Sequence, residues 1–235
     1  MDSNQKDKCP SPAVTSIVRA LSYVICKFFW LIKYHGRENI PDRSKGSYLV
    51  AANHQTYLDP VWVCLPIRNP LRFMAWDEAF EWRFIGPLIT YMGAFPVSME
   101  VGSTMKAMKE AMRILRSGAV LTVFPEGERE REDGRFRQFK PGIVRIALQA
   151  GVPILPVTID GGNKIWPQDQ KYPKLFRRVE ITYHPPMTIF EDKDLEPHEN
   201  LEKWTAKLQS VIASGLRQGN PLPERQNAEL SSEEF

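Results

Sequence analysis

Residues 48–60 read YLVAANHQTYLDP and join an apolar run to a polar loop. The run YLVAA has the unbroken apolar character of a strand buried on both faces, which is typical of a parallel sheet. The loop then places the imidazole of His54 five positions before the carboxylate of Asp59, and a proline follows at once. In sheets of parallel strands covered by helices, the loops that leave the carboxyl ends of strands form the active site. We therefore expect a buried strand here, followed by part of a site.

Further apolar segments and helical patterns alternate along the rest of the chain. The expected strands are GSYLVAAN (46–53), LRFMAW (71–76), GAFPV (93–97), AVLTVF (119–124), VPILPV (152–157) and VEITYH (179–184). The expected helices cover roughly 78–92, 103–117, 141–150 and 199–216. Glycine follows the second and third of these helices, where a C-terminal stop is expected. This alternation predicts an α/β fold with a mainly parallel sheet flanked by helices.

Composition limits the classes of partner. The chain has 235 residues, enough for one domain with appendages, and its three scattered cysteines indicate neither a disulfide framework nor a zinc site. The net charge is +3, but the last fifteen residues are acidic, so the preceding 220 residues carry +6. A mildly basic body suits anionic lipid headgroups, an acidic carrier protein or a phosphate-bearing substrate. We expect no nucleic-acid partner, because no nucleic-acid-binding motif is present.

Residues 13–35 form an apolar segment that two basic residues interrupt. Its apolar residues recur at helical spacing, and Arg19 and Lys27 break the run. The longest charge-free runs, ALSYVIC and FFWLI, are far shorter than the ~20 residues that a membrane span requires. Two interpretations remain: a core helix, or an amphipathic helix lying in the membrane interface.

The spacing of His54 and Asp59 is compatible with acid–base chemistry. Asp59 followed by proline predicts a helix start, with Asp59 as the N-cap. A carboxylate bound to one imidazole nitrogen fixes the tautomer and leaves the other nitrogen free to accept a proton. Taken alone, such a pair is more commonly a helix cap and an ordinary loop histidine.

The segment AVLTVFPEGERERED (119–133) is a second strand that leads into a polar loop. Gly127 permits a positive φ or the close approach of a ligand. Arg129 offers a planar guanidinium that suits phosphate. By itself this loop is most simply interpreted as a charged turn.

Four segments together resemble the sequence blocks of the glycerolipid acyltransferases, the family typified by 1-acyl-sn-glycerol-3-phosphate acyltransferase (lysophosphatidic acid acyltransferase). These segments are NHQTYLD (53–59), GAFPV (93–97), FPEGER (124–129) and VPILPV (152–157). The flanking segments GRENIP (36–41) and FKPGIVRIA (139–147) fit as well. The resemblance covers roughly residues 36–160, and the pairing of an H-x-x-x-x-D block with FPEG about 70 residues later is specific.

The resemblance implies transfer of a fatty acyl group from acyl-CoA or acyl carrier protein to the hydroxyl of a lysophospholipid. It favours 1-acyl-sn-glycerol-3-phosphate as acceptor, which would give phosphatidic acid, and it implies no metal and no other cofactor. It makes His54 the general base and Asp59 the residue that orients it. The residues it places in substrate binding are Glu126, Gly127, Arg129, Lys140 and Pro153, the last of these near the acyl path.

Polarity, apolar periodicity and charge, together with the resemblance, imply a division of the chain and a location. We expect a flexible N-terminus (1–12), an amphipathic membrane-associating helix (13–35), an acyltransferase domain (36–218) and an acidic disordered tail (219–235). The expected location is peripheral or monotopic, on the cytoplasmic face of a membrane lipid surface.

Two departures from the family pattern keep alternatives open. Ser98, Met99 and Glu100 stand where a basic residue is common, and Glu128 replaces a common threonine. Either Lys140 or Arg137 compensates for the missing cation, or the acceptor is a lysolipid other than lysophosphatidate. The non-enzymatic alternative is an inactive membrane-associated lipid-binding homologue.

Other enzyme classes lack their motifs in this chain. A serine hydrolase would need a G-x-S-x-G elbow, and a nucleotide enzyme would need a glycine-rich phosphate loop, and neither motif occurs. Cys64 lies in the helical run VWVCLPI, where a buried structural thiol is the simpler interpretation.

Overall fold

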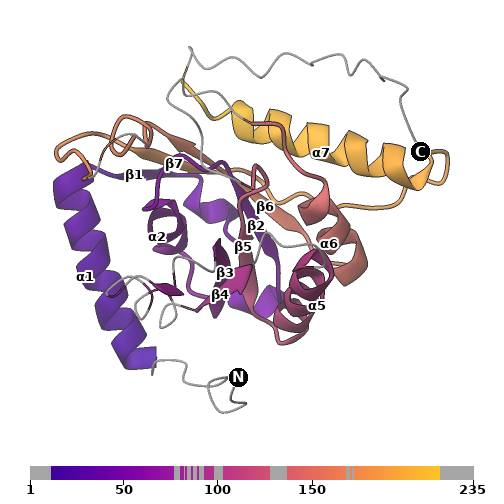
Figure 1. Cartoon of the computed structure of the whole chain (residues 1–235), viewed down its shortest axis with the longest axis horizontal. Coiled ribbons are helices and arrows are strands. Elements are labelled where there is room, and N and C mark those ends of the chain that lie inside the picture. Colours follow the sequence, from indigo (N-terminus) through magenta and orange to yellow (C-terminus); the bar gives the residue numbers. More distant parts are fainter. Residues whose placement is uncertain are drawn as a thin grey trace.

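In the part of the chain that the structure describes, seven strands form one sheet. Figure 1 shows this sheet in a computed structural model of the chain. The structure describes residues 12–76, 80, 81, 83, 86, 89, 93–97, 103–127, 137–167, 170 and 172–217. The expected flexible N-terminus and acidic tail lie outside these residues, apart from residue 12, and so does most of the expected helix 78–92.

The sheet has the strand order β1-β7-β6-β2-β5-β3-β4. Its strands are β1 (Lys33–His35), β2 (Leu49–Ala52), β3 (Leu71–Trp76), β4 (Ala94–Val97), β5 (Val120–Val123), β6 (Ile154–Asp160) and β7 (Glu180–Tyr183). Five of the six strand pairs are parallel, and the pair β6–β7 is antiparallel. The α/β fold is therefore confirmed, but the sheet is mixed, because β7 and β1 reverse direction.

Helices cover both faces of this sheet (Figure 1). Two helices lie on one face: α1 (Pro12–Trp30) and α2 (Asp59–Cys64). Three lie on the other: α5 (Ser103–Arg116), α6 (Gly142–Ala150) and α7 (Pro197–Ala213). The last three match the expected helices closely, and α6 ends as predicted, with Gly151 in the left-handed conformation at φ 65°.

The four residues of β2 show why this strand is central. All four are fully buried, which matches the unbroken apolar run YLVAA. Val50 and Ala52 face the core shared with α1 and α2, whereas Leu49 and Ala51 face the core shared with α5, α6 and α7. Successive side chains of a strand point to opposite faces, so burial on both faces requires a continuous apolar run.

The N-terminal helix is shorter than expected. It ends at Trp30 rather than near residue 35, and Leu31 turns the chain with φ 45°. Residues Lys33–His35 then form the edge strand β1, which pairs in parallel with β7. Alternation over three residues is too short a signal for sequence alone to reveal this strand. Within the described part of the chain, none of the helices has both the length and the apolar character needed to cross a membrane.

Candidate active site

The loop that carries His54 leaves the carboxyl end of β2 and is pinned at its start by Asn53. The Asn53 side-chain amide donates to the carbonyl oxygen of Ile159 at 2.9 Å, and its Oδ1 accepts the N–H of Ile159 at 2.7 Å. This pair of hydrogen bonds ties the loop to the neighbouring strand β6. The loop therefore starts from a defined position above the sheet.

Asp59 gathers the rest of the loop around one buried carboxylate. Its Oδ2 lies 2.9 Å from Nδ1 of His54 and accepts the backbone N–H groups of Gln55 at 2.5 Å and Thr56 at 2.7 Å. Its Oδ1 accepts the Thr56 hydroxyl at 2.8 Å. The carboxylate thus holds the imidazole in place and also supports the loop that carries it.

The expectation that Asp59 is the N-cap of α2 is wrong by one residue. Leu58 is the N-cap, Asp59 is the first helical residue, and Pro60 follows it in the first turn. Because the Asp59 side chain points back into the loop, it satisfies donors that precede the helix. The same residue therefore begins a helix and orients the histidine.

The pair has the geometry of a general base and the group that orients it. A carboxylate can only accept hydrogen bonds, so Nδ1 of His54 carries the proton and Nε2 is free to accept one. The His54 side chain is 19% exposed, whereas the Asp59 side chain is fully buried. The imidazole also stacks on Phe124 at the end of β5, with ring centroids 4.2 Å apart and planes 23° apart.

Glu126 links this loop to the loop that follows β5. Its Oε1 accepts the backbone N–H of His54 at 2.8 Å, and its Oε2 accepts the backbone N–H of Arg137 at 3.0 Å. Only 3% of the residue is exposed. The structure therefore places Glu126 as a brace behind His54, with both oxygens bound to the protein backbone.

Burial raises the pKa of Glu126 to about 7, and the negative charge of Asp59 acts in the same direction. The hydrogen bonds from the backbone N–H groups of Arg137 and His54, together with the charge of Arg137, lower this pKa. Burial is the largest of these effects, because the carboxylate loses its hydration.

Gly127 and Lys140 lie together beside this brace. Gly127 has φ 76°, and a Cβ at that position would lie 2.8 Å from Nζ of Lys140. The backbone N–H of Lys140 donates to the carbonyl oxygen of Pro125 at 2.9 Å, which holds the two segments together. Because Gly127 has no side chain, the Lys140 ammonium group fits beside the turn at Gly127.

Of the remaining expected site residues, the structure describes only Pro153. Arg129 and Glu128 lie outside the described residues. Pro153 lies at the amino-terminal ends of the strands, because its carbonyl oxygen accepts the N–H of Leu49 at the start of β2. His54 follows the carboxyl end of β2, five positions after Leu49, which corresponds to about 16 Å along a strand.

Sequence reasoning missed several residues of the site: Asn53, Gln55, Thr56 and Phe124. The first three lie inside the block NHQTYLD, and their polar character between two apolar runs was a usable signal. The contact of Phe124 with His54 depends on the pairing of β2 with β5, which a single sequence does not reveal.

Cys64 and His184 have structural environments. Burial raises the pKa of the Cys64 thiol to about 12, so the thiol stays protonated at neutral pH, and its sulfur lies 3.7 Å from the Thr122 hydroxyl oxygen. Nε2 of His184 lies 2.7 Å from the Thr158 hydroxyl oxygen, just after β7. Among the residues that the structure describes, no three His, Cys, Asp or Glu side chains gather as a metal site would require.

Comparison with known proteins agrees with this arrangement. A family model described as Acyltransferase matches residues 31–160. The chain is 31% identical over 160 residues to a chloroplastic 1-acyl-sn-glycerol-3-phosphate acyltransferase of Arabidopsis thaliana, covering 68% of this chain and 44% of the relative. It is 31% identical over 132 residues to the 1-acyl-sn-glycerol-3-phosphate acyltransferase of Borreliella burgdorferi, covering 56% of this chain and 52% of the relative.

A solved structure shares the fold. The crystal structure of the 1-acyl-sn-glycerophosphate acyltransferase of Thermotoga maritima matches with a TM-score of 0.67 and 25% sequence identity. The match covers 86% of this chain and 78% of that structure, whereas the chain spans about half the length of the two curated relatives. The family model covers more than half of this chain and includes the His54–Asp59 loop and Glu126. The chain therefore belongs to the acyltransferase family.

Proposed function

We propose that this protein transfers a fatty acyl group from acyl-CoA or acyl carrier protein to the free hydroxyl of a lysophospholipid. The proposed acceptor is 1-acyl-sn-glycerol-3-phosphate, and the product is phosphatidic acid. The observation that carries this proposal is the 2.9 Å contact between His54 and a fully buried Asp59, at the carboxyl end of a central strand. The relatives named as 1-acyl-sn-glycerol-3-phosphate acyltransferases support the choice of acceptor.

The proposed reaction uses the free nitrogen of His54. Nε2 takes the proton of the acceptor hydroxyl while its oxygen attacks the carbonyl carbon of the thioester. The carbon–sulfur bond then breaks, and the leaving sulfur takes the proton from the imidazolium. The products are the new ester and the free thiol of coenzyme A or the carrier protein, so protons balance. We infer that this route needs no metal or prosthetic group.

Asp59 has two effects on this step. Its carboxylate keeps the proton on Nδ1, so that Nε2 is the basic nitrogen in the resting state. The same negative charge stabilises the imidazolium that forms during attack. A positioned general base of this kind contributes roughly 100- to 10,000-fold to the rate.

The acceptor phosphate is proposed to lie near Gly127 and Lys140. The Lys140 ammonium lies close to Gly127. Because glycine has no side chain, a headgroup can approach the backbone there. Arg129 follows in the same loop and supplies the second cation of the proposal. Pro153, which comes directly before β6, stays a proposed residue near the acyl path.

The N-terminal helix is proposed to hold the protein on the membrane that contains its lipid substrate. Ile17, Leu21, Val24 and Phe28 of α1 are exposed and share one face of the helix. The opposite face is packed into the core through Cys26, and Trp30 packs on Trp62 with ring centroids 6.0 Å apart. Interfacial helices have this division into a packed face and an apolar outer face.

The test of the proposed function is release of free thiol by the purified protein with lysophosphatidate and each donor. Phosphatidic acid identified by mass spectrometry is the expected product. A panel that includes lysophosphatidylcholine and lysophosphatidylglycerol examines the alternative acceptors. If the folded protein transfers no acyl group from either donor to any lysolipid, the proposal is wrong. The protein would then be an inactive lipid-binding homologue.

A further inference from the structure

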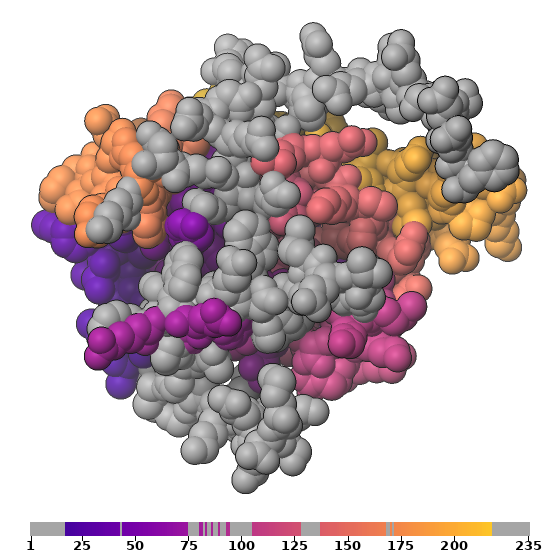
Figure 2. Space-filling model, in the orientation of Figure 1, coloured from indigo at the N-terminus to yellow at the C-terminus, as the bar shows by residue number. Residues whose placement is uncertain are grey.

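The segment Tyr172–Arg178 presents apolar side chains beside the exposed face of α1. Tyr172, Leu175 and Phe176 are all exposed, and Phe176 is 61% exposed although it is a large aromatic residue. Figure 2 shows the orange atoms of this region directly against the indigo atoms of the N-terminal helix. The segment and the helix therefore contribute to one surface.

Specific contacts join the segment to the end of α1. The ring of Phe176 packs on Phe28 and Phe29, with centroid separations of 6.0 and 6.1 Å. The backbone N–H of Phe176 donates to the carbonyl oxygen of Phe29 at 2.6 Å, and the Trp30 indole donates to the carbonyl oxygen of Lys174 at 3.1 Å. These bonds hold Phe176 in the left-handed conformation, at φ 58°, with its ring outward.

The charged side chains within α1 and within Tyr172–Arg178 are all basic. No aspartate or glutamate occurs between residues 8 and 37, or between residues 170 and 179. Lys174 and Arg177 are exposed beside Leu175 and Phe176. Arg178 pairs with Glu180 at 3.2 Å, so its charge is already partly balanced.

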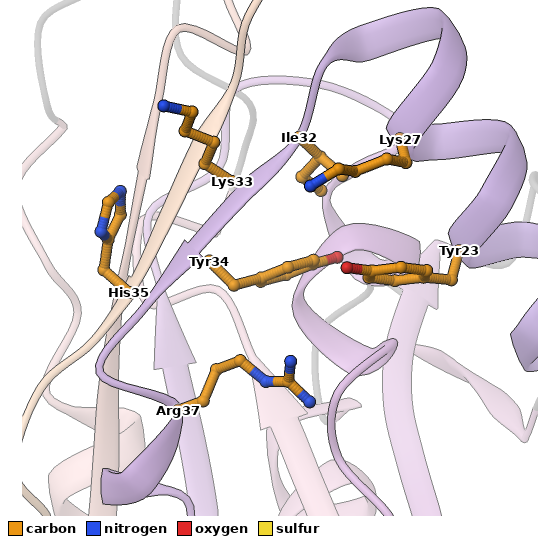
Figure 3. Close-up of a pocket in the computed structure, with 7 residues that line it drawn as sticks. All are labelled: Tyr23, Lys27, Ile32, Lys33, Tyr34, His35 and Arg37. Atoms are coloured by element: carbon orange, nitrogen blue, oxygen red, sulfur yellow. The ribbon is translucent and has the colours of Figure 1, made fainter.

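A basic pocket of about 290 Å³ lies on the other flank of α1, between that helix and β1. Figure 3 shows Tyr23 reaching from the helix toward Tyr34, and Lys27 reaching from the same helix toward Ile32. The two tyrosine rings stack with centroids 6.2 Å apart. Lys33, His35 and Arg37 complete its lining with Ile32, and none of these residues is acidic. The apolar face of α1 therefore has basic side chains on both flanks.

The chain just before Tyr172–Arg178 contacts the active-site loop. The backbone N–H of Gly162 donates to Oε1 of Gln55 at 2.8 Å, and Trp166 packs on Tyr57 with ring centroids 5.4 Å apart. The backbone N–H of Lys174 then donates to the carbonyl oxygen of Ile165 at 2.8 Å. Residues 161–167 and 172–178 thus link the His54 loop to the exposed surface.

We propose that Tyr172–Arg178 is a second membrane-docking element, which inserts Leu175 and Phe176 beside α1 into the surface of an anionic bilayer. Apolar side chains enter the interface while the surrounding Lys and Arg side chains meet anionic headgroups. Docking through this segment holds the His54 loop close to the membrane surface, from which a lipid acceptor enters the site. The proposal rests on the proposed function for the lipid nature of that acceptor.

The test is co-sedimentation of the full chain with vesicles of phosphatidylcholine alone and of phosphatidylcholine mixed equally with phosphatidylglycerol. Leu175→Ser combined with Phe176→Asn removes the two apolar groups, and asparagine tolerates the left-handed backbone at residue 176. We expect binding to mixed vesicles to weaken about 10-fold or more, from the loss of apolar burial. The matched control is Phe190→Asn, which changes a 58% exposed phenylalanine that packs on α7, away from α1, and should leave binding unchanged.

A charge variant keeps the test independent of the packing of Phe176. Lys174→Gln with Arg177→Gln should weaken binding to the mixed vesicles by roughly 5-fold per residue, and leave binding to phosphatidylcholine alone unchanged. If both double variants bind like wild type while Leu21→Ser with Phe28→Ser loses binding, α1 docks alone and the proposal is wrong. If the Leu175/Phe176 variant instead abolishes self-association in sedimentation velocity without vesicles, this surface joins two copies of the chain and the proposal is also wrong.

The failure of the proposed function is distinguishable from these outcomes. Vesicle binding does not require turnover, so it tests docking even if no acyl transfer occurs. In detergent solution, where no bilayer must be met, the Leu175/Phe176 variant should release thiol at the wild-type rate. Loss of that activity in a variant that still binds vesicles would assign the segment to the active site and overturn its role in docking.

Discussion

The carboxylate of Glu126 accepts the backbone N–H of His54 at 2.8 Å, so the loop after β5 holds the loop after β2. The second oxygen of Glu126 accepts the N–H of Arg137 at 3.0 Å. The buried Glu126 side chain therefore positions the backbone of His54, the proposed base. It also holds the backbone of Arg137, which lies further along its own loop. Residues far apart in sequence act here as one unit, because their strands are neighbours in the sheet.

Glu126→Gln should therefore lower turnover at pH 8, where the carboxylate is ionised. Glutamine has one acceptor oxygen, so at residue 126 its amide group must face one of the two backbone N–H donors. We expect slower thiol release, because the backbone of His54 or Arg137 must move away from that amide group. Glu199→Gln is the matched control, because the carboxylate of Glu199 also accepts a backbone N–H but lies on the exposed start of α7. Equal effects of the two substitutions would contradict the bracing role.

The raised pKa of Glu126 predicts a pH dependence of stability. The unfolded chain releases this proton near pH 4.5, whereas the folded protein keeps it until about pH 7. The folded state thus binds more protons in this window, so the contribution of Glu126 is full below pH 4.5 and is lost as pH rises to 7. Relative to Glu126→Gln, wild type should lose about 3 kcal/mol across the window, since each pH unit carries about 1.36 kcal/mol. A constant difference between the two unfolding free energies would show that the carboxylate is ionised throughout.

His54→Ala should reduce the rate of thiol release at least ~100-fold, without a matching loss of stability, because the side chain supplies the base. His198→Ala, at an exposed histidine near the start of α7, is the control and should behave like wild type. A His54→Ala protein with a near-normal rate on its acceptor would exclude His54 as the base.

Asp59→Asn should lower both rate and stability. In either amide orientation, the asparagine NH2 group replaces one acceptor oxygen. It then faces either the backbone N–H groups of Gln55 and Thr56 or the Thr56 hydroxyl, all of which donate to the carboxylate in the wild type. A buried donor left without an acceptor costs roughly 1–3 kcal/mol. The check is a urea titration alongside the rate assay, and an unchanged midpoint would show that the loop does not depend on this carboxylate.

Gly127→Ala compared with Gly118→Ala separates backbone strain from contact with Lys140. Both glycines have positive φ, 76° and 80°, so both substitutions carry a similar strain of about 1–2 kcal/mol. Only the Cβ at residue 127 meets another group, the Lys140 ammonium at 2.8 Å, whereas nothing lies within 4 Å at residue 118. We expect KM for lysophosphatidate to rise in Gly127→Ala alone. A rise in both variants would mean that strain, rather than displacement of Lys140, is responsible.

Lys140→Ala should discriminate between acceptors. A charge-assisted hydrogen bond to phosphate is worth roughly 1.5–3 kcal/mol, so kcat/KM for lysophosphatidate should fall about 10- to 150-fold. A zwitterionic lysolipid should lose much less, and the exposed Lys193→Ala serves as control. An equal loss with both acceptors would remove Lys140 from phosphate recognition.

Much of the fold could be predicted because its signals are local. The run YLVAA is long and unbroken. A strand with this sequence must be buried on both faces, whichever strands pair with it. Helix ends were equally local, since a glycine such as Gly151 adopts the left-handed conformation at little steric cost. The contact between His54 and Asp59 could also be predicted, because only four residues separate them and the family blocks surround them.

The remaining features depend on contacts between distant segments, and only the tertiary structure decided them. Whether Glu126 faces a headgroup or a backbone amide depends on the pairing of β2 with β5. Because β6 runs parallel to β2, Pro153 lies at the amino-terminal ends of these strands, whereas His54 follows the carboxyl end of β2. The reversal at β7 and the three-residue strand β1 follow from the packing of Ile32 and Tyr183 in the core, which no short-range periodicity records. Sequence alone determines what a segment must bury, whereas the fold determines which buried groups meet.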